Sequence, residues 1–480
     1  MMDVVVVGGG PAGVTAALRA RELGARVVLL ERDRMGGTCT NDGCVPTRVL
    51  AKTARLLRDA EQFDDYGLSG DIPSVDFQRL LARTQQVVYT IHEKKQIIGH
   101  LERSGVKVIN EIGPVRFFDA HTLEWNENSR IEADRIILCA GGRARRIDFP
   151  GAELALTHSD VWSLDHLPKS IIIVGGAATG CQLASIFSAF GAQVTILEIS
   201  PRILRVEDQS ISRVIGEEFE KRGIQIITEF DGVSRIEKVG DQLTLYFQKS
   251  GAEHTLTSEA VLLSTGWVGN LSSLNLAAAG VETVGHYIKV DDHLRTNLPH
   301  IFAAGDITGR MMLVQSAGYE ALAAAENAVL GGEQRLKHQI VPHGGFTDPE
   351  YGSVGLTEEQ AIASHDVVSI EVPYADMDRA VIDGHPVGLC KLIVSRETHR
   401  LLGAHVVGEQ ALEVVQLVAA GMASDMWIEQ LAELQIAYPT FTAILGLAAR
   451  RVVKDLGVRP LAPEWRTISA PLAAEWERRD

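Results

Sequence analysis

Apolar runs and helical patterns alternate at the start of the chain and predict a strand–helix–strand unit. The run Val4–Val7 ends in a glycine-rich stretch, a helical pattern follows over Val14–Leu23, and Gly24 stops it before the run Val27–Leu30. The same order returns later, with strands at Ile171–Val174 and Val194–Leu197 around a helix at Cys181–Phe190. We therefore predict an α/β protein that contains two parallel-sheet units.

The rest of the chain is expected to form a third part. A length of 480 residues indicates three domains rather than one core. Changes of pattern suggest seams near four residues, Pro150, Pro168, Val290 and Gln339. After Gln339 short strands alternate with helices, and no third glycine-rich turn of the same kind follows.

Composition narrows the class of protein. A chain that is 46% hydrophobic and 22% charged is typical of a globular protein, and a net charge of −16 argues against nucleic acid or an anionic membrane as a partner. No run of 18 apolar residues predicts a membrane span. Because the first strand begins at Asp3, we expect no signal or transit peptide and a cytoplasmic location. Five cysteines are too few for a disulfide framework, so a close pair favours redox catalysis or metal binding.

The first glycine-rich turn predicts a dinucleotide site. A pyrophosphate needs backbone N–H groups at a helix start, and a side chain at the closest point would block it. Gly8, Gly10 and Gly13 have the required spacing, and Glu31 ends the second strand, where a carboxylate accepts hydrogen bonds from ribose hydroxyls. The alternative is a glycine-rich turn with no nucleotide. The flanking strand and helix favour the dinucleotide.

The second turn predicts a site for a nicotinamide nucleotide. Gly175 and Gly180 match the pattern, whereas Ala177 replaces the middle glycine and crowds the pyrophosphate slightly. Glu198 occupies the ribose position, where its charge repels a 2′-phosphate, so NADH is favoured over NADPH. Two arginines follow closely and keep NADPH open, Arg202 and Arg205.

The segment Gly36–Arg48 carries the most specific signal, the pair Cys39 and Cys44. A disulfide needs Cα atoms roughly 4.4–6.8 Å apart, whereas five helical steps rise about 7.5 Å, so the segment must bend, and Gly43 permits this. A thiol at the start of the following helix has a lowered pKa, and two close thiols can exchange two electrons. Two buried unpaired cysteines, or a zinc site, are the weaker alternatives. The other cysteines fit as small core residues, Cys139, Cys181 and Cys390.

Together these motifs resemble the pyridine nucleotide–disulfide oxidoreductases, the family of dihydrolipoamide dehydrogenase, glutathione reductase and mercuric reductase. The resemblance covers nearly the whole chain and includes further segments at Ile136–Gly142, Val261–Gly266, Ile301–Asp306, Phe346–Glu350 and Leu402–His405. It implies two Rossmann-like domains, for FAD and NAD(P), and a C-terminal α+β dimerisation domain. The implied boundaries are 1–150 and 290–339 for the FAD domain, 151–289 for the NAD(P) domain and 340–480 for the dimerisation domain.

The resemblance also implies a route for electrons. NADH would pass hydride to the flavin, and the electrons would cross to the disulfide. Cys44 resembles the thiol beside the flavin, Cys39 the thiol that exchanges with substrate, and Asp306 the residue that binds the ribityl chain. Further cofactor contacts are implied for Gly37, Thr38, Gly141, Gln182 and Gly266. In a homodimer the partner subunit would complete the substrate site.

Two departures from the family pattern affect this expectation. Tyr438 stands where the family carries a histidine before Pro-Thr, and Ala443 where a glutamate supports it, so the usual acid–base is missing. A tyrosine with a pKa near 10 is a poor base at pH 7, although it can donate a hydrogen bond or simply fill the site. Arg48 and Gln182 replace a lysine–glutamate pair and leave a less compensated positive charge, which we expect to favour reduced flavin.

Three functions remain open at this stage. The leading hypothesis is an NAD(P)H-dependent oxidoreductase acting on a small-molecule or protein thiol or disulfide. The second is reduction of a metal ion or a quinone, although the tail Thr467–Asp480 lacks the cysteine pair with which mercuric reductases deliver metal. The third is a redox sensor or electron relay with little turnover of its own.

Overall fold

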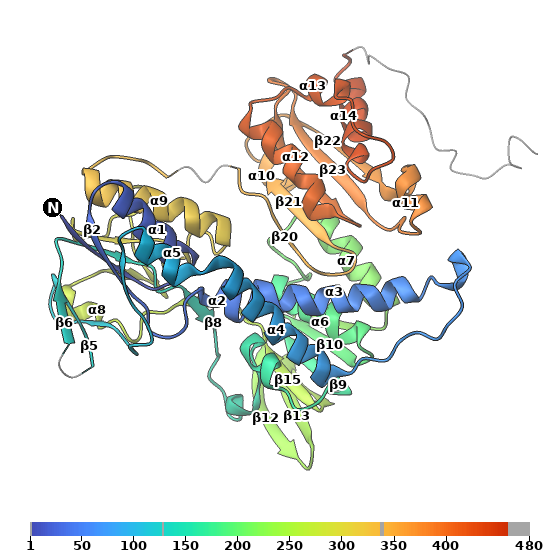
Figure 1. The fold of residues 1–480 in the computed structure, drawn as a ribbon. Coiled ribbons are helices and arrows are strands. Elements are labelled where there is room, and N and C mark those ends of the chain that lie inside the picture. The colour runs from blue at the N-terminus through green and yellow to red at the C-terminus, as the bar shows by residue number, and fades with distance from the viewer. Residues whose placement is uncertain (1, 127–128, 337–339, 459–480) are drawn as a thin grey trace, which may run out of the picture. The chain divides into compact units, whose positions relative to one another are not determined.

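The computed structural model describes residues 2–126, 129–336 and 340–458, so the tail Thr467–Asp480 lies outside the described residues. The chain forms two compact units (Figure 1). The first contains the described residues up to Ile203 and those from Arg222 to 336. The second contains Leu204–Lys221 and the described residues from Ile340 to 458. The segment Leu204–Lys221, which the sequence places inside the nucleotide-binding part, thus belongs to the second unit.

A five-stranded parallel sheet forms the centre of one half of the first unit. Its strands, in spatial order, are β19 (Ile301–Ala303), β7 (Arg135–Leu138), β1 (Asp3–Val7), β2 (Arg26–Leu30) and β3 (Lys107–Ile109). The apolar run of β1 is buried on both faces, as expected for a strand inside a parallel sheet. Helices α1 (Pro11–Glu22) and α9 (Val314–Leu330) pack against each other through buried alanines, which let the two backbones approach closely.

A second parallel sheet repeats this plan. Its order is β11 (Gln225–Thr228), β10 (Gln193–Glu198), β9 (Ser170–Val174) and β15 (Ala260–Leu263). Its first crossover helix, α6, spans Ala178–Ala189. Both α1 and α6 begin three residues before the positions predicted from the pattern. Their first turns contain glycine, proline and small residues, which show no apolar periodicity.

Smaller elements connect and flank the two sheets. The strands β8 (Gly142–Ala144) and β16 (Trp267–Gly269) pair antiparallel where the chain passes between the sheets. Two antiparallel sheets flank them, β12 (Gly232–Val239), β13 (Gln242–Lys249), β14 (Ala252–Ser258) and β4 (Arg116–Phe117), β5 (Thr122–Trp125), β6 (Ser129–Glu132). The remaining elements are η1 (Asp64–Tyr66), α5 (Ile97–Arg103), η2 (Ala152–Leu154), η3 (His158–Ser163), α8 (Leu276–Ala279), β17 (Thr283–Val284), β18 (Tyr287–Ile288) and η4 (Asp306–Thr308).

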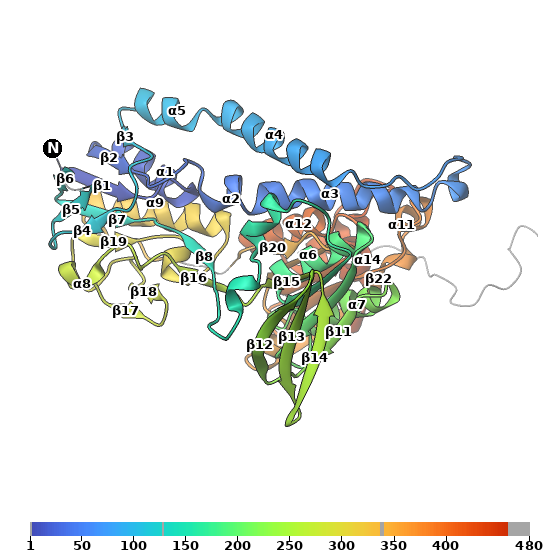
Figure 2. The same cartoon turned by 90° about the horizontal axis from the view of Figure 1, so that it is seen from below.

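The cysteine segment forms two helices separated by a break. The short helix α2 (Gly37–Asn41) contains Cys39, and α3 (Cys44–Ala60) begins at Cys44. Helix α3 packs against α6 and runs beside α4 (Phe77–Lys95), as Figure 2 shows. The predicted bend at Gly43 is therefore present, and it places Cys44 at the start of α3, next to the short helix that contains Cys39.

The second unit is an antiparallel sheet covered by helices. Its order is β20 (His343–Gly345), β21 (Tyr351–Gly355), β24 (Leu401–Val407), β23 (Leu389–Ser395) and β22 (Val367–Pro373). The helices are α7 (Gln209–Lys221), α10 (Glu358–Ile362), η5 (Tyr374–Asp376), α11 (Asp378–Ile382), α12 (Ala411–Ala423), α13 (Ile428–Glu433) and α14 (Ala443–Asp455). Alternate residues such as Val354, Leu392 and Ala404 share one apolar core with α12 and α14.

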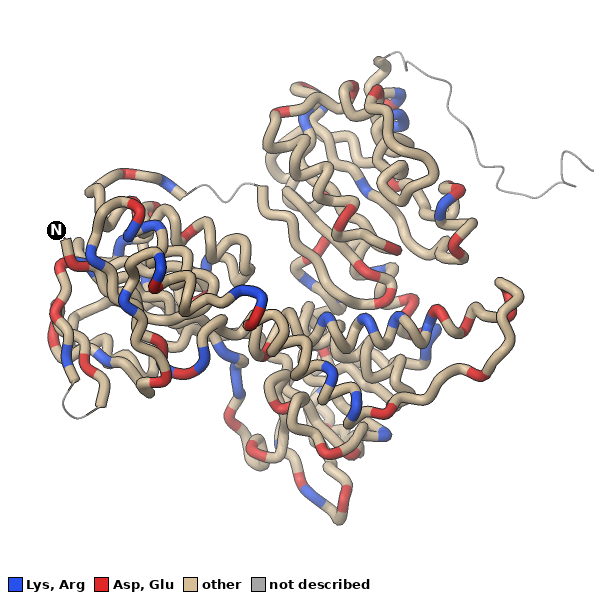
Figure 3. Tube along the Cα trace, viewed as in Figure 1, with Lys and Arg blue, Asp and Glu red and all other residues tan. Residues whose placement is uncertain are grey.

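Charge and hydropathy of the described residues agree with the composition. In the view of Figure 3, basic and acidic residues are interspersed along both units. No helix within the described ranges is long and apolar enough to cross a membrane.

Candidate active site

The first glycine-rich turn joins β1 to α1, and its three glycines are required for different structural reasons. A Cβ at Gly8, which has φ +107°, would lie 2.3 Å from the carbonyl oxygen of Cys139, and one at Gly13 would lie 1.7 Å from that of Gly8. These two glycines are needed for the chain to pack on itself. A Cβ at Gly10 would meet only the Cα of Gly37, at 3.6 Å. Of the three, only Gly10 leaves the helix start open to a ligand.

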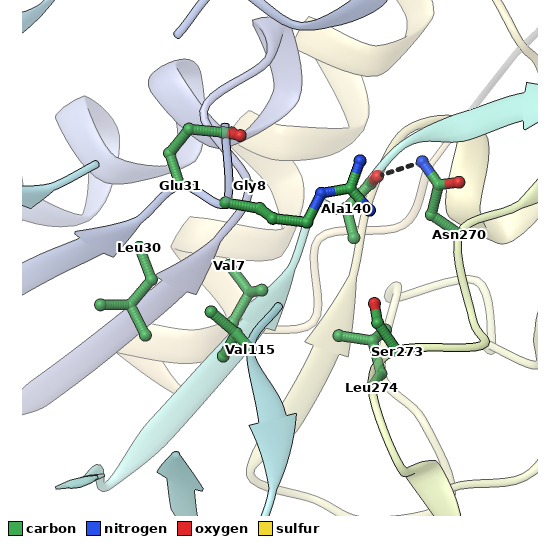
Figure 4. Close-up of a pocket in the computed structure, with 10 residues that line it drawn as sticks. Val7, Gly8, Leu30, Glu31, Val115, Ala140, Asn270, Ser273 and Leu274 are labelled. Atoms are coloured by element: carbon green, nitrogen blue, oxygen red, sulfur yellow. Dashed lines mark hydrogen bonds between the residues drawn. The ribbon is translucent and has the colours of Figure 1, made fainter. Parts of the chain in front are cut away.

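Glu31 lies beside this turn at the end of β2. Its carboxylate accepts hydrogen bonds from the backbone N–H of Gly9 at 2.5 Å and of Asp33 at 2.8 Å. Figure 4 shows Glu31 at the edge of a cleft whose walls include apolar side chains, and the cleft is lined by Val7, Gly8, Leu30, Glu31, Arg32, Val115, Ala140, Asn270, Ser273 and Leu274. An apolar slot with one carboxylate suits an adenine and its ribose.

Several residues of this cleft were missed by sequence reasoning. Asn270 donates a hydrogen bond from its side-chain nitrogen to the carbonyl oxygen of Ala140 at 2.8 Å, which ties the chain after β16 to the end of β7. Ser273 and Leu274 follow on the same stretch. The only sequence signal was their position just after a strand that follows Gly266, and such a position does not identify a wall of a distant site.

Asp306 follows β19 and is the predicted ribityl contact. Burial and the neighbouring charge of Glu320 raise the pKa of Asp306 to about 6. Glu320 is fully buried and accepts a hydrogen bond from the N–H of Gly305 at 2.7 Å. A partly desolvated carboxylate is stabilised by hydroxyl donors, which a ribityl chain supplies. The glycine turn, Glu31 and Asp306 therefore fit FAD, whose isoalloxazine ring supplies two-electron chemistry when bound.

The second glycine-rich turn has the same construction. A Cβ at Gly175 would lie 2.2 Å from the carbonyl oxygen of Ser264, and one at Gly180 would lie 1.9 Å from that of Gly175. Ala177 has φ −83° and ψ −174°, almost the same as the −76° and −174° of Gly10. This conformation suits any residue, so alanine is tolerated without backbone strain.

Glu198 ends β10 as Glu31 ends β2. It accepts hydrogen bonds from the N–H of Gly176 at 2.7 Å and of Ser200 at 2.8 Å. Gly266, at φ +99°, follows β15 in the same way that Gly141, at φ +70°, follows β7. The two sheets thus present matching strand ends, each with a turn, a carboxylate and a glycine.

Backbone contacts join the cysteine segment to the first glycine turn. The N–H of Gly36 donates to the carbonyl oxygen of Gly9 at 2.9 Å, and Gly37 lies directly against Gly10. The carbonyl oxygen of Thr38 accepts hydrogen bonds from Asp42 at 2.9 Å and Gly43 at 2.6 Å, which closes the loop between the cysteines. The structure thus brings the predicted redox pair next to the predicted FAD turn.

The two thiols differ in acidity because they are hydrogen-bonded to each other. A hydrogen bond from Cys39 lowers the pKa of Cys44 to about 7, against the opposing effects of burial and Asp306. The same hydrogen bond, with burial, raises the pKa of Cys39 well above its usual range. In the reduced pair Cys44 therefore carries the negative charge and Cys39 the proton. The remaining cysteines, Cys139, Cys181 and Cys390, are buried.

Arg48 and Gln182 lie on neighbouring helices. Arg48 is exposed on α3, one turn after Cys44, and Gln182 is on α6, where its side-chain nitrogen donates to the carbonyl oxygen of Ala178 at 3.0 Å. Helices α3 and α6 pack together. Arg48 thus lies close to Cys44 in the chain, and Gln182 lies on a helix that packs against α3.

Tyr438 lies in the second unit, so the described chain gives no contact between it and Cys39. Its side chain is 75% exposed, and its hydroxyl donates a hydrogen bond to Asp378 at 2.6 Å. This hydrogen bond and the charge of Asp378 raise the pKa of Tyr438. The phenol is therefore held in its protonated form.

Comparisons with known proteins agree with this geometry. Residues 2–321 match the family model described as pyridine nucleotide-disulphide oxidoreductase, and residues 341–449 match the dimerisation domain of that family. The chain is 32% identical over 454 residues to a dihydrolipoyl dehydrogenase of Bacillus subtilis, covering 92% of this chain and 97% of the relative. It is 30% identical over 458 residues to a mercuric reductase of Lysinibacillus sphaericus, covering 95% and 83%.

Solved structures include a similar protein. The HOCl-induced flavoprotein disulfide reductase RclA of Escherichia coli has a TM-score of 0.82 at 28% identity, and the match covers 93% of this chain and 99% of that chain. A Cu(II) complex of the same reductase has a TM-score of 0.81 at 28% identity, covering 92% and 98%. The chain belongs to the pyridine nucleotide–disulphide oxidoreductase family, as an FAD-dependent enzyme that transfers electrons between a nicotinamide nucleotide and a disulfide.

Proposed function

We propose that the enzyme oxidises NADH and reduces, through Cys39 and Cys44, a disulfide whose leaving thiol is acidic. The observation that carries this proposal is the state of Tyr438, which occupies the histidine position of the family signature. Its hydroxyl is committed to Asp378, and its pKa is raised rather than lowered. A phenol in that state is a weaker acid than a released thiol, so it does not readily protonate a leaving thiolate, and it accepts no proton at neutral pH. The acceptor must therefore release its thiolate without protonation by a built-in histidine.

The cysteine pair supports the first half of such a reaction. Because the Cys39 thiol donates to Cys44, the Cys44 thiolate is positioned to take the proton as Cys39 attacks. The attack forms a mixed disulfide between Cys39 and the substrate and releases one substrate thiolate. Cys44 then gives that proton to solvent or to the released thiolate, attacks the mixed disulfide as a thiolate and displaces the second substrate thiolate, which forms the Cys39–Cys44 disulfide. Two electrons pass to the substrate, and leaving-group acidity sets how easily each thiolate departs.

A series of disulfides that runs from aromatic to aliphatic thiols tests this dependence. With saturating NADH, we expect turnover to fall by roughly tenfold or more as the pKa of the leaving thiol rises from about 5 to about 9. Tyr438→Phe removes only the hydroxyl and should keep the same dependence of turnover on the pKa of the leaving thiol. The double variant Tyr438→His/Ala443→Glu restores the histidine and glutamate of the family pattern. It should weaken the dependence of turnover on the pKa of the leaving thiol. Turnover that is independent of leaving-thiol pKa, while substrate exchange limits the rate, would contradict the proposal.

The preference for NADH rests on Glu198. Its carboxylate is held by Gly176 and Ser200 at the end of β10, where a 2′-phosphate would meet its charge. We expect kcat/KM to be at least about tenfold higher for NADH than for NADPH. Glu198→Gln should reduce this ratio of kcat/KM values, mainly because the KM for NADPH becomes lower. Glu229→Gln changes an exposed glutamate of the same unit and serves as the control. An unchanged ratio in Glu198→Gln would reject this assignment.

A metal ion is the second candidate acceptor. Reduction of a soft metal ion at a thiol pair releases no thiolate and needs no acid–base residue, and the reductase RclA has been solved as a Cu(II) complex. Anaerobic NADH oxidation driven by Cu(II), followed with a Cu(I)-specific chelator, measures this activity. Turnover with Cu(II) but with none of the disulfides would make the metal ion the substrate. No turnover with either class would favour an electron-relay role.

We further propose a homodimer. Residues 341–449 match the family's dimerisation domain, and Tyr438 is largely exposed within the described chain. Sedimentation of the FAD-loaded protein measures the oligomeric state directly.

A further inference from the structure

The segment between the two redox cysteines carries a carboxylate that is tied to a distant part of the first unit. Asp42 lies at the break between α2 and α3. One carboxylate oxygen accepts a hydrogen bond from the Ser159 hydroxyl at 2.7 Å, and the other accepts one from the indole N–H of Trp162 at 2.9 Å. The same indole N–H lies 3.0 Å from the backbone oxygen of Asp42, and His158 Nε2 lies 3.5 Å from its carboxylate. We call these four residues the Asp42 cluster.

The three partners of Asp42 come from η3, which is itself firmly held. Asp160 caps its start by accepting hydrogen bonds from the N–H and the hydroxyl of Thr157, at 2.6 and 2.8 Å, and it accepts another from Arg146 at 3.0 Å. The His158 ring packs against the Trp267 ring on β16 with 4.7 Å between ring centres. The Asp42 cluster therefore connects the redox segment to the strands that link the two sheets.

Other hydrogen bonds also hold the segment. Those to the carbonyl oxygen of Thr38 close the loop from within and move with it. Asn41 and Thr40 link it to α4, through His92 at 2.7 Å and Lys95 at 3.4 Å. Asp42 supplies the link to η3. Burial opposes its ionisation, but the hydrogen bonds from His158, Ser159 and Trp162 lower the pKa of Asp42 below its usual value. Asp42 is thus a carboxylate at neutral pH, and its hydrogen bonds are charge-assisted and strong.

We propose that Asp42 is a positioning residue that fixes the segment between Cys39 and Cys44 so that their disulfide is favoured over the dithiol. This rests on the proposed redox role of the two cysteines. A dithiol held in bonding geometry has a high effective concentration and closes readily. When the segment is released, the sulfurs separate and the disulfide becomes easier to reduce, so the midpoint potential rises. A tenfold change in the equilibrium constant corresponds to about 30 mV for this two-electron couple.

The test measures the couple directly in the full-length, FAD-loaded protein. Dithiothreitol supplies the electrons: it gives two electrons and two protons, becomes a cyclic disulfide, and converts the protein disulfide to two thiols. Free thiols are alkylated across a range of dithiothreitol redox ratios, and mass spectrometry counts the labels on Cys39 and Cys44. We expect Asp42→Asn to shift the equilibrium constant about tenfold towards the dithiol. Asp33→Asn changes an exposed carboxylate near the segment and should leave it unchanged.

Trp162→Phe tests the same contact without altering the cysteine segment. It removes the indole N–H together with part of the ring, and it should shift the equilibrium constant in the same direction by a smaller factor. In the double variant Asp42→Asn/Trp162→Phe, the fold-change in the equilibrium constant should be smaller than the product of the fold-changes in the two single variants. The reason is that both substitutions break the same contact. A purely structural role would lower the melting temperature in both variants without changing the dithiol equilibrium. That result, or an equilibrium constant equal to wild type in both, overturns the proposal.

The same measurement separates this inference from the proposed function. Should the wild-type cysteines form no disulfide at any dithiothreitol ratio, the proposed redox pair fails and the positioning role fails with it. Should the wild type form the disulfide and both variants behave like it, the redox pair stands and only the role of Asp42 is rejected.

Discussion

Cys39→Ser is expected to lower disulfide reduction by at least about a thousandfold while leaving NADH oxidation by a quinone or dye largely intact. Cys39 is the thiol that would attack the substrate, and a serine hydroxyl cannot form the mixed disulfide. Electron transfer from NADH to bound FAD does not use this sulfur. Steady-state turnover with each acceptor, measured on protein of equal FAD content, checks both halves of the expectation.

Cys44→Ser should produce a different phenotype. Because Cys44 is the thiol whose pKa is lowered to about 7, it is the thiolate of the reduced pair. Reduced wild-type enzyme should therefore show a thiolate absorbance that appears as the pH rises through about 7, and Cys44→Ser should lack it. Cys39→Ala removes the hydrogen bond that favours this thiolate, so the transition of Cys44 in that variant should move to higher pH. Cys390→Ala, at a buried isolated cysteine, is the matched control.

One outcome would redirect the functional assignment. If Cys39→Ser retains wild-type turnover with disulfides, then the pair is not the exchange site and the acceptor must react elsewhere. If turnover with Cu(II) falls in parallel with turnover of disulfides, both acceptors use the same two sulfurs.

Lys391→Met should cause the largest loss of stability, about 3–5 kcal/mol in the second unit, because it leaves the buried carboxylate of Asp208 without its cation. Lys391 is only 4% exposed on β23, and its ammonium lies 3.0 Å from Asp208, 2.5 Å from Glu358 and 3.5 Å from Glu371. Hydrogen exchange across Leu389–Ser395, together with chemical unfolding of the full chain, measures the loss. Lys221→Met, at an exposed lysine of α7 paired with Glu218, should cost far less stability than Lys391→Met.

The stability lost in Lys391→Met should depend on pH, because the pKa values of Asp208 and Lys391 are both shifted in the folded protein. Burial opposes the charge of Asp208, but hydrogen bonds from Glu358 and Ser210 lower its pKa, so its stabilisation is present above about pH 4 and is lost on acidification. Burial also opposes the charge of Lys391, but its acidic partners raise its pKa. Its stabilisation is therefore complete below about pH 10 and is lost as pH rises through the raised value. The loss of stability in Lys391→Met should be constant between about pH 4 and about pH 10, and it should become smaller outside this range.

A double variant distinguishes an uncompensated charge from a packing defect. Asp208→Asn/Lys391→Met removes both members of the most deeply buried pair and should recover part of the loss seen in Lys391→Met alone. A double variant that is as unstable as the sum of the two single variants would contradict the ion-pair explanation.

Local pattern was sufficient where the determinants lie close together in the chain. The strands around Gly8 and Gly175 are apolar runs beside glycines, and the bend at Gly43 follows from the four residues that separate the two cysteines. The predicted starts of α1 and α6 fall three residues after the observed ones. A first turn of glycine, proline and small residues shows no apolar periodicity, so the pattern does not reveal it. The family resemblance, confirmed by the comparisons, carried the cofactor assignment further than periodicity alone.

By itself, the sequence determined that the chain forms two nucleotide-binding units, with a cysteine pair at a helix start and a tyrosine in place of the family histidine. Only the tertiary structure decided that Asp42 meets Ser159, 117 residues away, that Asn270 ties the cleft wall to Ala140, and that Asp208 joins Lys391 in the second unit. The physical reason is range. Backbone conformation and amphipathic periods depend on near neighbours, whereas a buried polar pair depends on where two separately formed elements meet.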